Sequence, residues 1–442
     1  FQIAPCFRDE DARADALEGA GASHLASRTL DGMSSGDARR VLLARVLVTK
    51  PRALVLDDCA DPVLPEPVAL PPAEEPSRAR LALSAATALP VTPAGVLRAT
   101  GGAGGEAQPT GRHTPTLLNA AFNTWYFWDG RADTLWGQAA GPLEHPVEMA
   151  GTRIAVVRYV YDTREVRDAY ENVFGALPPR ASLDPFPLRG RPVPDPQNAV
   201  DEEHQAAWES MTDEDQDTVN LIFANVLKAI AAYERRLVSM DAPFDRYVDQ
   251  LRQFPDAPQR WTAIDEGAQE GARLFVEVVG CRECHKGPML SDGAFHNLGL
   301  PEGESADSND QGRWTGLPQA RESLWSSASI YSDDPEGNQA QLLMALPQRE
   351  ADKGAFRTPS LRNLGSTAPF MHAGQIATLR EVLDFYNEPP EGVPHVGRRS
   401  SEVNDLKLES SQIAALLAFL ESLNGEPVPA EYREQPESPL LP

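Results

Sequence analysis

Five residues in the second half of the sequence combine two thiols and an imidazole at a fixed spacing. Cys281 and Cys284 are separated by two residues, and His285 directly follows the second cysteine. This spacing lets both sulfurs add to the vinyl groups of a haem while the imidazole reaches the iron from one side. We therefore expect one covalent c-type haem, held by Cys281, Cys284 and His285.

A thioredoxin-like dithiol and half of a zinc site are the two competing interpretations of this cysteine pair. The dithiol needs a surrounding βαβ pattern, whereas the flanks 265–276 and 411–423 have helical spacing and would enclose the motif as in a class I cytochrome c. A zinc site needs a second ligand pair at short range. The other two cysteines, Cys6 and Cys59, lie more than 200 residues away, and the next histidine is His296. The sequence favours haem.

The iron of such a haem needs a ligand on its second side, or an open site there. Three residues downstream of the motif could supply that ligand: Met371, His372 and Tyr386. A thioether raises the potential of the iron, and histidine lowers it. Any one of the three could equally be a core residue, so the alternatives stay open on this evidence.

Composition divides the 442 residues into four zones. Residues 1–60 read as helix then strand, and 61–110 form a Pro/Gly-rich linker. Residues 111–261 contain a long amphipathic helix that is expected to begin near Thr212, with apolar residues from Val219 to Leu237 on one face. Residues 262–442 hold the haem motif and form the expected cytochrome c domain.

The net charge of −25 and the absence of long apolar runs limit the partners. An acidic surface repels phosphate backbones and anionic lipid, which argues against nucleic acid and membranes. No run of about 18 apolar residues could span a bilayer. The first residues, from Phe1 onward, contain no secretory signal.

Several blocks of the sequence resemble the bacterial di-haem cytochrome c peroxidase and MauG family. They occur in the family's order from residue 111 to the C-terminus and include Phe127-Trp-Asp-Gly-Arg131, Leu290-Ser-Asp-Gly-Ala-Phe-His296, Phe356-Arg-Thr-Pro-Ser-Leu-Arg362 and Thr367-Ala-Pro-Phe-Met-His372. The resemblance implies a mainly α fold with two cytochrome c-like lobes. Only the C-terminal lobe, 262–442, would carry a haem, and 111–261 would be the remnant of the other lobe.

Family roles can be transferred to the matching positions. Trp128 matches the tryptophan that bridges the two haems, Glu148 the distal carboxylate that moves protons during peroxide cleavage, and Gln138 a distal amide. Tyr386 stands where the family places an axial Met or Tyr, and the resemblance therefore favours it over Met371. Further matches are Arg357 and Arg362, which would bind the cofactor, and the carbonyls of Thr367 and Pro369, which would bind calcium. His113 replaces the family's third calcium ligand, an asparagine.

The sequence departs from this family upstream of residue 111, because Cys-x-x-Cys-His occurs once and the first haem motif is absent. In the family that first haem meets peroxide, so Glu148 would face a pocket without its iron. We expect a haem oxidoreductase that uses hydrogen peroxide and a small redox protein or a protein substrate. A monohaem electron-transfer protein is the alternative, and it leaves the enzymatic status open. The resemblance also implies a periplasmic protein that could form a homodimer.

The N-terminal residues have a second resemblance. The segment from Met33 to Arg45 and the run Pro51-Arg-Ala-Leu-Val-Leu-Asp-Asp58 resemble the signature helix and Walker B strand of an ABC transporter ATPase. A small α/β fragment at 1–60 is thereby predicted. The phosphate-binding Gly-x-x-x-x-Gly-Lys-Ser/Thr loop is missing from the sequence. A non-functional chimeric reading frame is therefore a third hypothesis.

Overall fold

The computed structural model describes residues 110–442, apart from 184, 301–308, 391–395, 430–431 and 433–442. The predicted ABC-like fragment (1–60) and nearly all of the predicted linker (61–110) lie outside these residues. The described part is mainly helical, as expected. Its helices are α4 (Leu135–Glu144), α5 (Arg153–Asp162), α6 (Arg164–Phe174), α7 (Ala199–Glu209), α8 (Asp213–Glu234), α9 (Pro243–Gln253), α10 (Glu266–Arg273), α11 (Arg313–Glu322), α12 (Asn338–Ala345), α13 (Leu379–Asn387) and α14 (Ser410–Glu421).

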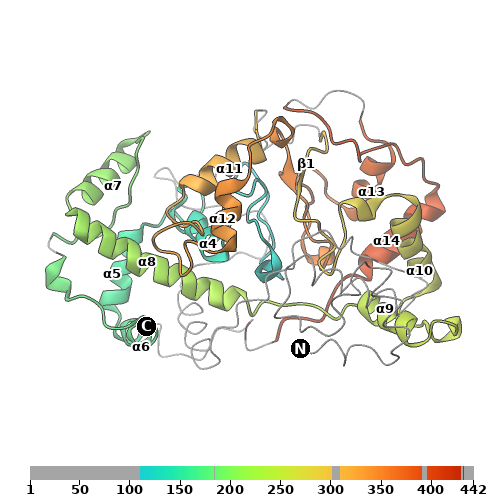
Figure 1. The fold of residues 1–442 in the computed structure, drawn as a ribbon, viewed down its shortest axis with the longest axis horizontal. Helices are drawn as coiled ribbons and strands as arrows, with labels where there is room; N and C mark the ends of the chain where they lie inside the picture. The colour runs from blue at the N-terminus through green and yellow to red at the C-terminus, as the bar shows by residue number, and fades with distance from the viewer. Residues whose placement is uncertain (1–109, 184, 301–308, 391–395, 430–431, 433–442) are drawn as a thin grey trace, which may run out of the picture.

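One short antiparallel pair of strands is formed by β1 (Phe295–His296) and β2 (Phe356–Arg357). The helices lie in two groups on either side of β1. Helices α5 to α8 occupy one end of the molecule, α9, α10, α13 and α14 occupy the other, and α4, α11 and α12 lie between them (Figure 1). No helix in the described part of the chain is long and apolar enough to cross a membrane.

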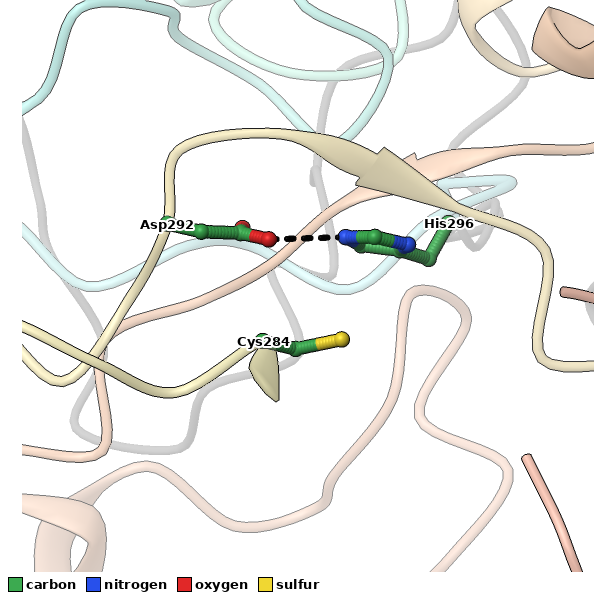
Figure 2. A group of neighbouring side chains, drawn as sticks. All are labelled: Cys284, Asp292 and His296. Atoms are coloured by element: carbon green, nitrogen blue, oxygen red, sulfur yellow. Dashed lines mark hydrogen bonds and ion pairs between the residues drawn. The ribbon is translucent and has the colours of Figure 1, made fainter. Parts of the chain in front are cut away.

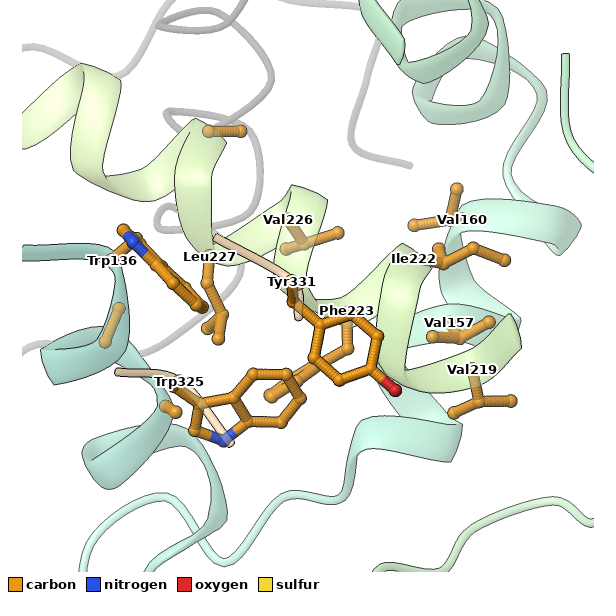
Figure 3. Packing of buried hydrophobic residues seen from close by; sticks show 14 of the residues in the cluster. Trp136, Val157, Val160, Val219, Ile222, Phe223, Val226, Leu227, Trp325 and Tyr331 are labelled. Atoms are coloured by element: carbon orange, nitrogen blue, oxygen red, sulfur yellow. The ribbon is translucent and has the colours of Figure 1, made fainter. Parts of the chain in front are cut away.

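The long helix α8 organises the first core. The hydroxyl of Thr212 accepts a hydrogen bond from the backbone N–H of Asp215, which caps the helix at the predicted position. Val219, Ile222 and Phe223 are almost fully buried. They pack with residues of α4 and α5, as Figure 3 shows. The three- and four-residue spacing in the sequence therefore predicted this helix face from Val219 onward, although the helix ends at Glu234, before the predicted Leu237.

The first core also takes residues from the second half of the sequence. Trp325 and Tyr331 lie in it, with the Trp325 ring 5.4 Å from that of Phe223. Leu317 of α11 and Leu343 of α12 pack against Trp125 nearby. Conversely, Phe244 and Tyr247 of α9 belong to the second core. The two cores are therefore interleaved along the sequence, and a single division near residue 261 does not separate them.

The second core is built on the crossing of α10 and α14. Asp265 caps α10 by accepting from the N–H of Ala268, and the helix ends at Arg273. A π-helical turn, Leu274–Val278, replaces the last turn that was predicted to continue to 276, and leads into the Cys–His motif. Gly271 faces the backbone of Ala415, where a β-carbon would collide with the carbonyl oxygen. Glycine therefore permits the close approach of the two helices that flank the motif.

Candidate functional site

A cavity of about 290 Å³ lies next to the Cys–His motif. Cys281, Cys284 and His285 form one part of its wall, and residues from the first half of the described chain form another. The predicted site residues that line it are Trp128, Cys281, Cys284, His285, Arg357, Arg362, Thr367, Pro369, Met371 and Tyr386. The structure thus brings together residues that are up to 258 positions apart in the sequence.

The backbone around the motif fixes the orientation of His285. Gly280 has φ = 72°, and Cys281–Glu283 then form a 3₁₀ turn in which the N–H of His285 donates to the carbonyl of Cys281 (2.9 Å). The Nδ1 atom of His285 lies 3.0 Å from the carbonyl oxygen of Leu290. Because a carbonyl only accepts, Nδ1 carries the proton and Nε2 is left with a free lone pair. Burial also lowers the pKa of His285, which keeps the ring neutral.

The three candidate distal ligands all line this same cavity. Tyr386 is presented by α13, which Thr378 caps, and burial raises the pKa of its phenol. Met371 has φ = 71°, in the left-handed region. His372 stacks on Phe356 with the ring centres 3.7 Å apart, and burial lowers its pKa to about 4. The geometry gathers the candidates without choosing among them.

The two predicted cofactor-binding arginines have different surroundings. Arg362 donates to both carboxylate oxygens of Asp245 (2.7 and 2.8 Å) and to the carbonyl of Pro288 (2.6 Å). Burial works against ionisation of Asp245, but the hydrogen bond and charge of Arg362 prevail and lower its pKa. All three nitrogens of the Arg362 guanidinium thus donate to protein partners, and its charge is paired with Asp245.

Arg357 has only weak partners, although it is 8% exposed. Its contacts with the carbonyls of Phe127 and Thr358 and with the Oδ1 of Asn123 are all 3.4 Å long. No carboxylate of the described residues pairs with it. Burial lowers its pKa to about 10, and the charge is therefore retained at neutral pH. A buried cation that faces a cavity without an anion is suited to an anionic ligand.

Trp128 reaches the cavity from the first half of the chain. Its indole Nε1 donates to the carbonyl of His113 (2.7 Å), and its own carbonyl accepts from the N–H of Arg357 (2.7 Å). Next to it, Arg112 pairs with Asp129 (2.5 Å) and Asp310 (2.6 Å). These bonds connect the loop that contains Trp128 and Asp129 to Asp310 and Arg357, in the second half of the chain.

One group beside the motif was not assigned from the sequence. His296 Nε2 lies 2.8 Å from Asp292 Oδ2, and the sulfur of Cys284 lies beside this pair (Figure 2). The hydrogen bond with Asp292, followed by that with Cys284, raises the pKa of His296 to about 10. The Asp-x-x-x-His spacing was visible in the sequence, but only the turn that precedes β1 brings Asp292 and His296 close to Cys284.

Comparison with known proteins identifies the family. The model of the di-haem cytochrome c peroxidase family matches residues 91–253. The cytochrome-c peroxidase IdrP1 of Denitromonas iodatirespirans is 31% identical over 320 residues, which cover 71% of this chain and 68% of the relative. The methylamine utilization protein MauG of Methylorubrum extorquens is 30% identical over 319 residues, covering 72% and 66%. This chain belongs to the di-haem cytochrome c peroxidase and MauG family.

Two solved structures share the fold. A MauG-like protein associated with microbial copper homeostasis is 22% identical, with a TM-score of 0.50 over 88% of this chain and 97% of that one. The diheme peroxidase BthA from Burkholderia thailandensis is 18% identical, with a TM-score of 0.51 over 80% and 86%. The family membership makes haem c the expected cofactor of the cavity.

Gln138 and Glu148, to which the resemblance assigns distal-pocket roles, lie outside this cavity, and Glu148 was expected to face the pocket of the missing first haem. Gln138, on α4, lines a separate cavity of about 20 Å³, whose wall it shares with Arg357. Glu148 follows α4 in a turn, where its Oε1 lies 3.7 Å from the Nδ1 of His145. The structure does not bring either side chain to the Cys–His motif.

The calcium ligands suggested by the family pattern are differently engaged. Nε2 of His113 lies 3.2 Å from the carbonyl oxygen of Thr367, the group expected to bind the ion. Burial lowers the pKa of His113. Calcium prefers oxygen ligands, and an imidazole that bonds to the carbonyl fits a calcium site poorly. Here the hydrogen bond itself joins the two segments.

Proposed function

We propose that this chain is a c-type haem oxidoreductase that carries one covalent haem in the cavity between the two cores. The observation that carries the proposal is the composition of the cavity wall, where Cys281, Cys284, His285, Arg357 and Trp128 converge. Two thiols, a neutral imidazole and an unpaired buried cation match the vinyl groups, iron and propionates of haem. Once bound, haem supplies reversible one-electron transfer and the capacity to reduce peroxide.

The protein residues have separate tasks in this proposal. The Leu290 carbonyl orients His285, so that Nε2 would be the atom that holds the haem iron. Tyr386 is our choice of distal ligand on family grounds. Its phenol is protonated at neutral pH because burial raises its pKa, so it must lose that proton to bind iron.

Trp128 is the proposed electron bridge. A backbone carbonyl accepts its N–H hydrogen bond but cannot accept the proton. An oxidised indole would therefore keep its proton as a radical cation, and it would return to the neutral form by taking an electron from a neighbouring donor.

The proposed reaction is oxidation of a small redox protein or a protein substrate by hydrogen peroxide. In this family pattern Glu148 moves protons and Gln138 assists it. Because neither side chain lines the haem cavity, single-haem electron transfer without peroxide turnover is the competing function. Both proposals place the protein in the periplasm. Neither requires calcium, a nucleic acid or a membrane, and homodimer formation stays a prediction.

Haem content is the first test. The chain would be expressed for export with the c-type maturation machinery, and haem would be counted by pyridine haemochrome and intact mass. We expect one covalent haem, lost in Cys281→Ala/Cys284→Ala. Absence of covalent haem from the unaltered chain would refute the proposal.

Peroxide turnover then separates the two functions. Oxidation of a reduced small c-type cytochrome would be followed with and without hydrogen peroxide. If Glu148 moves protons in this reaction, Glu148→Gln should lower the peroxide-dependent rate about 100-fold, and the exposed Glu209→Gln on α7 is the control; an equal rate in both variants would remove Glu148 from the reaction. Electron exchange that is indifferent to peroxide would favour the carrier function.

A further inference from the structure

Cys284, Asp292 and His296 form a compact group of three different metal-binding side chains. One ligand atom of each, the sulfur, a carboxylate oxygen and an imidazole nitrogen, lies within 4.8 Å of the other two. Among the residues that the structure describes, this is the group that meets that criterion. All three side chains are half-buried. Figure 2 shows the sulfur beside the point where Asp292 and His296 meet.

The backbone holds the three positions together over a span of thirteen residues. The N–H of Asp292 donates to the carbonyl of Cys284 (2.8 Å), and the Oδ1 of Asp292 accepts from the N–H of Ala294 (2.9 Å). His296 lies on β1 and is paired with Phe356 of β2. The group is therefore anchored to a turn and a strand pair, and it does not depend on flexible side chains of distant segments.

The donor set and spacing match a specific class of ion. Thiolate, imidazole and carboxylate together are the ligands of Zn²⁺ and of similar borderline cations. Bond lengths of about 2.0–2.3 Å put tetrahedral ligands roughly 3.3–3.7 Å apart. The observed separations come within about 1 Å of this range, which side-chain rotations can close. Water could complete the fourth position.

We propose that the haem-free chain binds one divalent cation of the zinc class through Cys284, Asp292 and His296, and that this ion excludes haem attachment at Cys284. Thioether formation adds the S–H bond across a vinyl C=C, with sulfur going to one carbon and hydrogen to the other. A metal-bound Cys284 thiolate lacks the S–H proton that this addition consumes, and the cation holds one of its lone pairs and lowers its nucleophilicity. Conversely, an attached haem leaves Cys284 as a thioether, and two protein ligands remain.

The binding itself is tested on the full-length haem-free chain, produced without the maturation machinery. Cys6 and Cys59 are first replaced by serine so that they cannot contribute thiolates. Co²⁺ is the probe, because its bond to a thiolate gives a charge-transfer absorption. We expect one Co²⁺ per chain with this absorption, and its displacement by Zn²⁺.

Variants within the motif show whether the named group is the site. Cys284→Ser and His296→Asn should lose the absorption or weaken binding at least tenfold, whereas the matched control Cys281→Ser should retain it. Circular dichroism would check that the variants are folded equally. Absence of the absorption in the parent chain, or equal loss in Cys281→Ser and Cys284→Ser, would overturn the proposal.

The exclusion of haem has its own readout. Prior addition of Zn²⁺ should slow covalent haem attachment in the parent chain. In His296→Asn, the Zn²⁺ concentration needed for the same slowing should be at least tenfold higher. Equal inhibition in both would show that zinc acts elsewhere. Because metal binding is read without haem, its outcome is independent of the proposed oxidoreductase activity.

Discussion

Replacing Arg357 by methionine should change stability in opposite directions in the haem-free and haem-loaded chains. The guanidinium is 8% exposed, and burial lowers its pKa from 12.5 to about 10. One pKa unit corresponds to about 1.36 kcal/mol, so burying this charge costs roughly 3 kcal/mol. The folded-state pKa lies below the unfolded one. The penalty is therefore complete at every pH below about 10 and fades only between pH 10 and 12.5.

At pH 7 the haem-free Arg357→Met chain should gain about 2–3 kcal/mol in the free energy of unfolding, since the hydrogen bonds that it loses are long and weak. In the loaded chain the same substitution leaves a buried propionate without its cation. Breaking such a buried pair costs about 3–5 kcal/mol. The sign of the effect should therefore reverse on haem loading.

Urea unfolding of both forms at pH 7 measures this reversal. Arg362→Met is the matched control, because Asp245 already pairs with Arg362 and both forms should lose stability. If Arg357→Met destabilised the haem-free and loaded forms to the same extent, Arg357 would be a purely structural residue. The assignment of the cavity cation to a propionate would then be refuted.

Three further outcomes test the fold and the site. Burial raises the pKa of Glu234 from 4.5 to about 8, so stability should fall as pH rises from 4.5 to 8; Glu234→Gln should remove about 5 kcal/mol of that fall in urea unfolding, while the exposed Glu214→Gln should not. Gly271→Ala should lower the unfolding free energy by about 1–3 kcal/mol in thermal scans, because its β-carbon meets the Ala415 carbonyl; Gly267→Ala, in the same helix, should have a smaller effect, because its β-carbon would meet only the Asp265 side-chain oxygen, at 3.3 Å. Tyr386→Met should raise the haem potential by on the order of 0.1 V in redox titration, and an unchanged potential would remove Tyr386 as the distal ligand.

The helices were the part of the fold that the sequence could predict. The cap at Thr212 and the spacing of Val219 and Ile222 are local signals, and they placed α8 closely. The insertion of Trp325 into the first core carries no local signal, because an apolar residue in a loop does not show which of two cores it joins. The π-helical turn after Arg273 was missed for a similar reason, since α and π turns share the same hydrophobic residues.

At the site, the spacing of Cys281, Cys284 and His285 predicts haem attachment because one short segment supplies all three residues, and the structure places them in the cavity wall. The lack of an anionic partner for Arg357 could not be predicted, since it depends on which carboxylates the folded chain leaves at a distance. The proximity of His296 to Cys284 depends likewise on the turn that precedes β1. Motif spacing thus predicts ligands within a segment, whereas charge pairing between segments requires the fold.

The hydrogen bonds of Trp128 help to distinguish the two proposed functions, peroxide reduction and single-haem electron transfer. Its indole N–H binds the His113 carbonyl, and the N–H of His113 in turn donates to the carbonyl of His372 (2.8 Å). Its own carbonyl binds Arg357. The proposed electron bridge is thus fixed at both ends to segments that line the haem cavity.

Electron transfer from a single haem towards the first core requires only this arrangement. Peroxide cleavage also requires a proton donor at the reacting oxygen, and Glu148 lies outside the cavity. Electron transfer through Trp128 would therefore use residues that line the cavity, whereas peroxide cleavage would also use Glu148 outside it, and the response of the rate to peroxide distinguishes between the two.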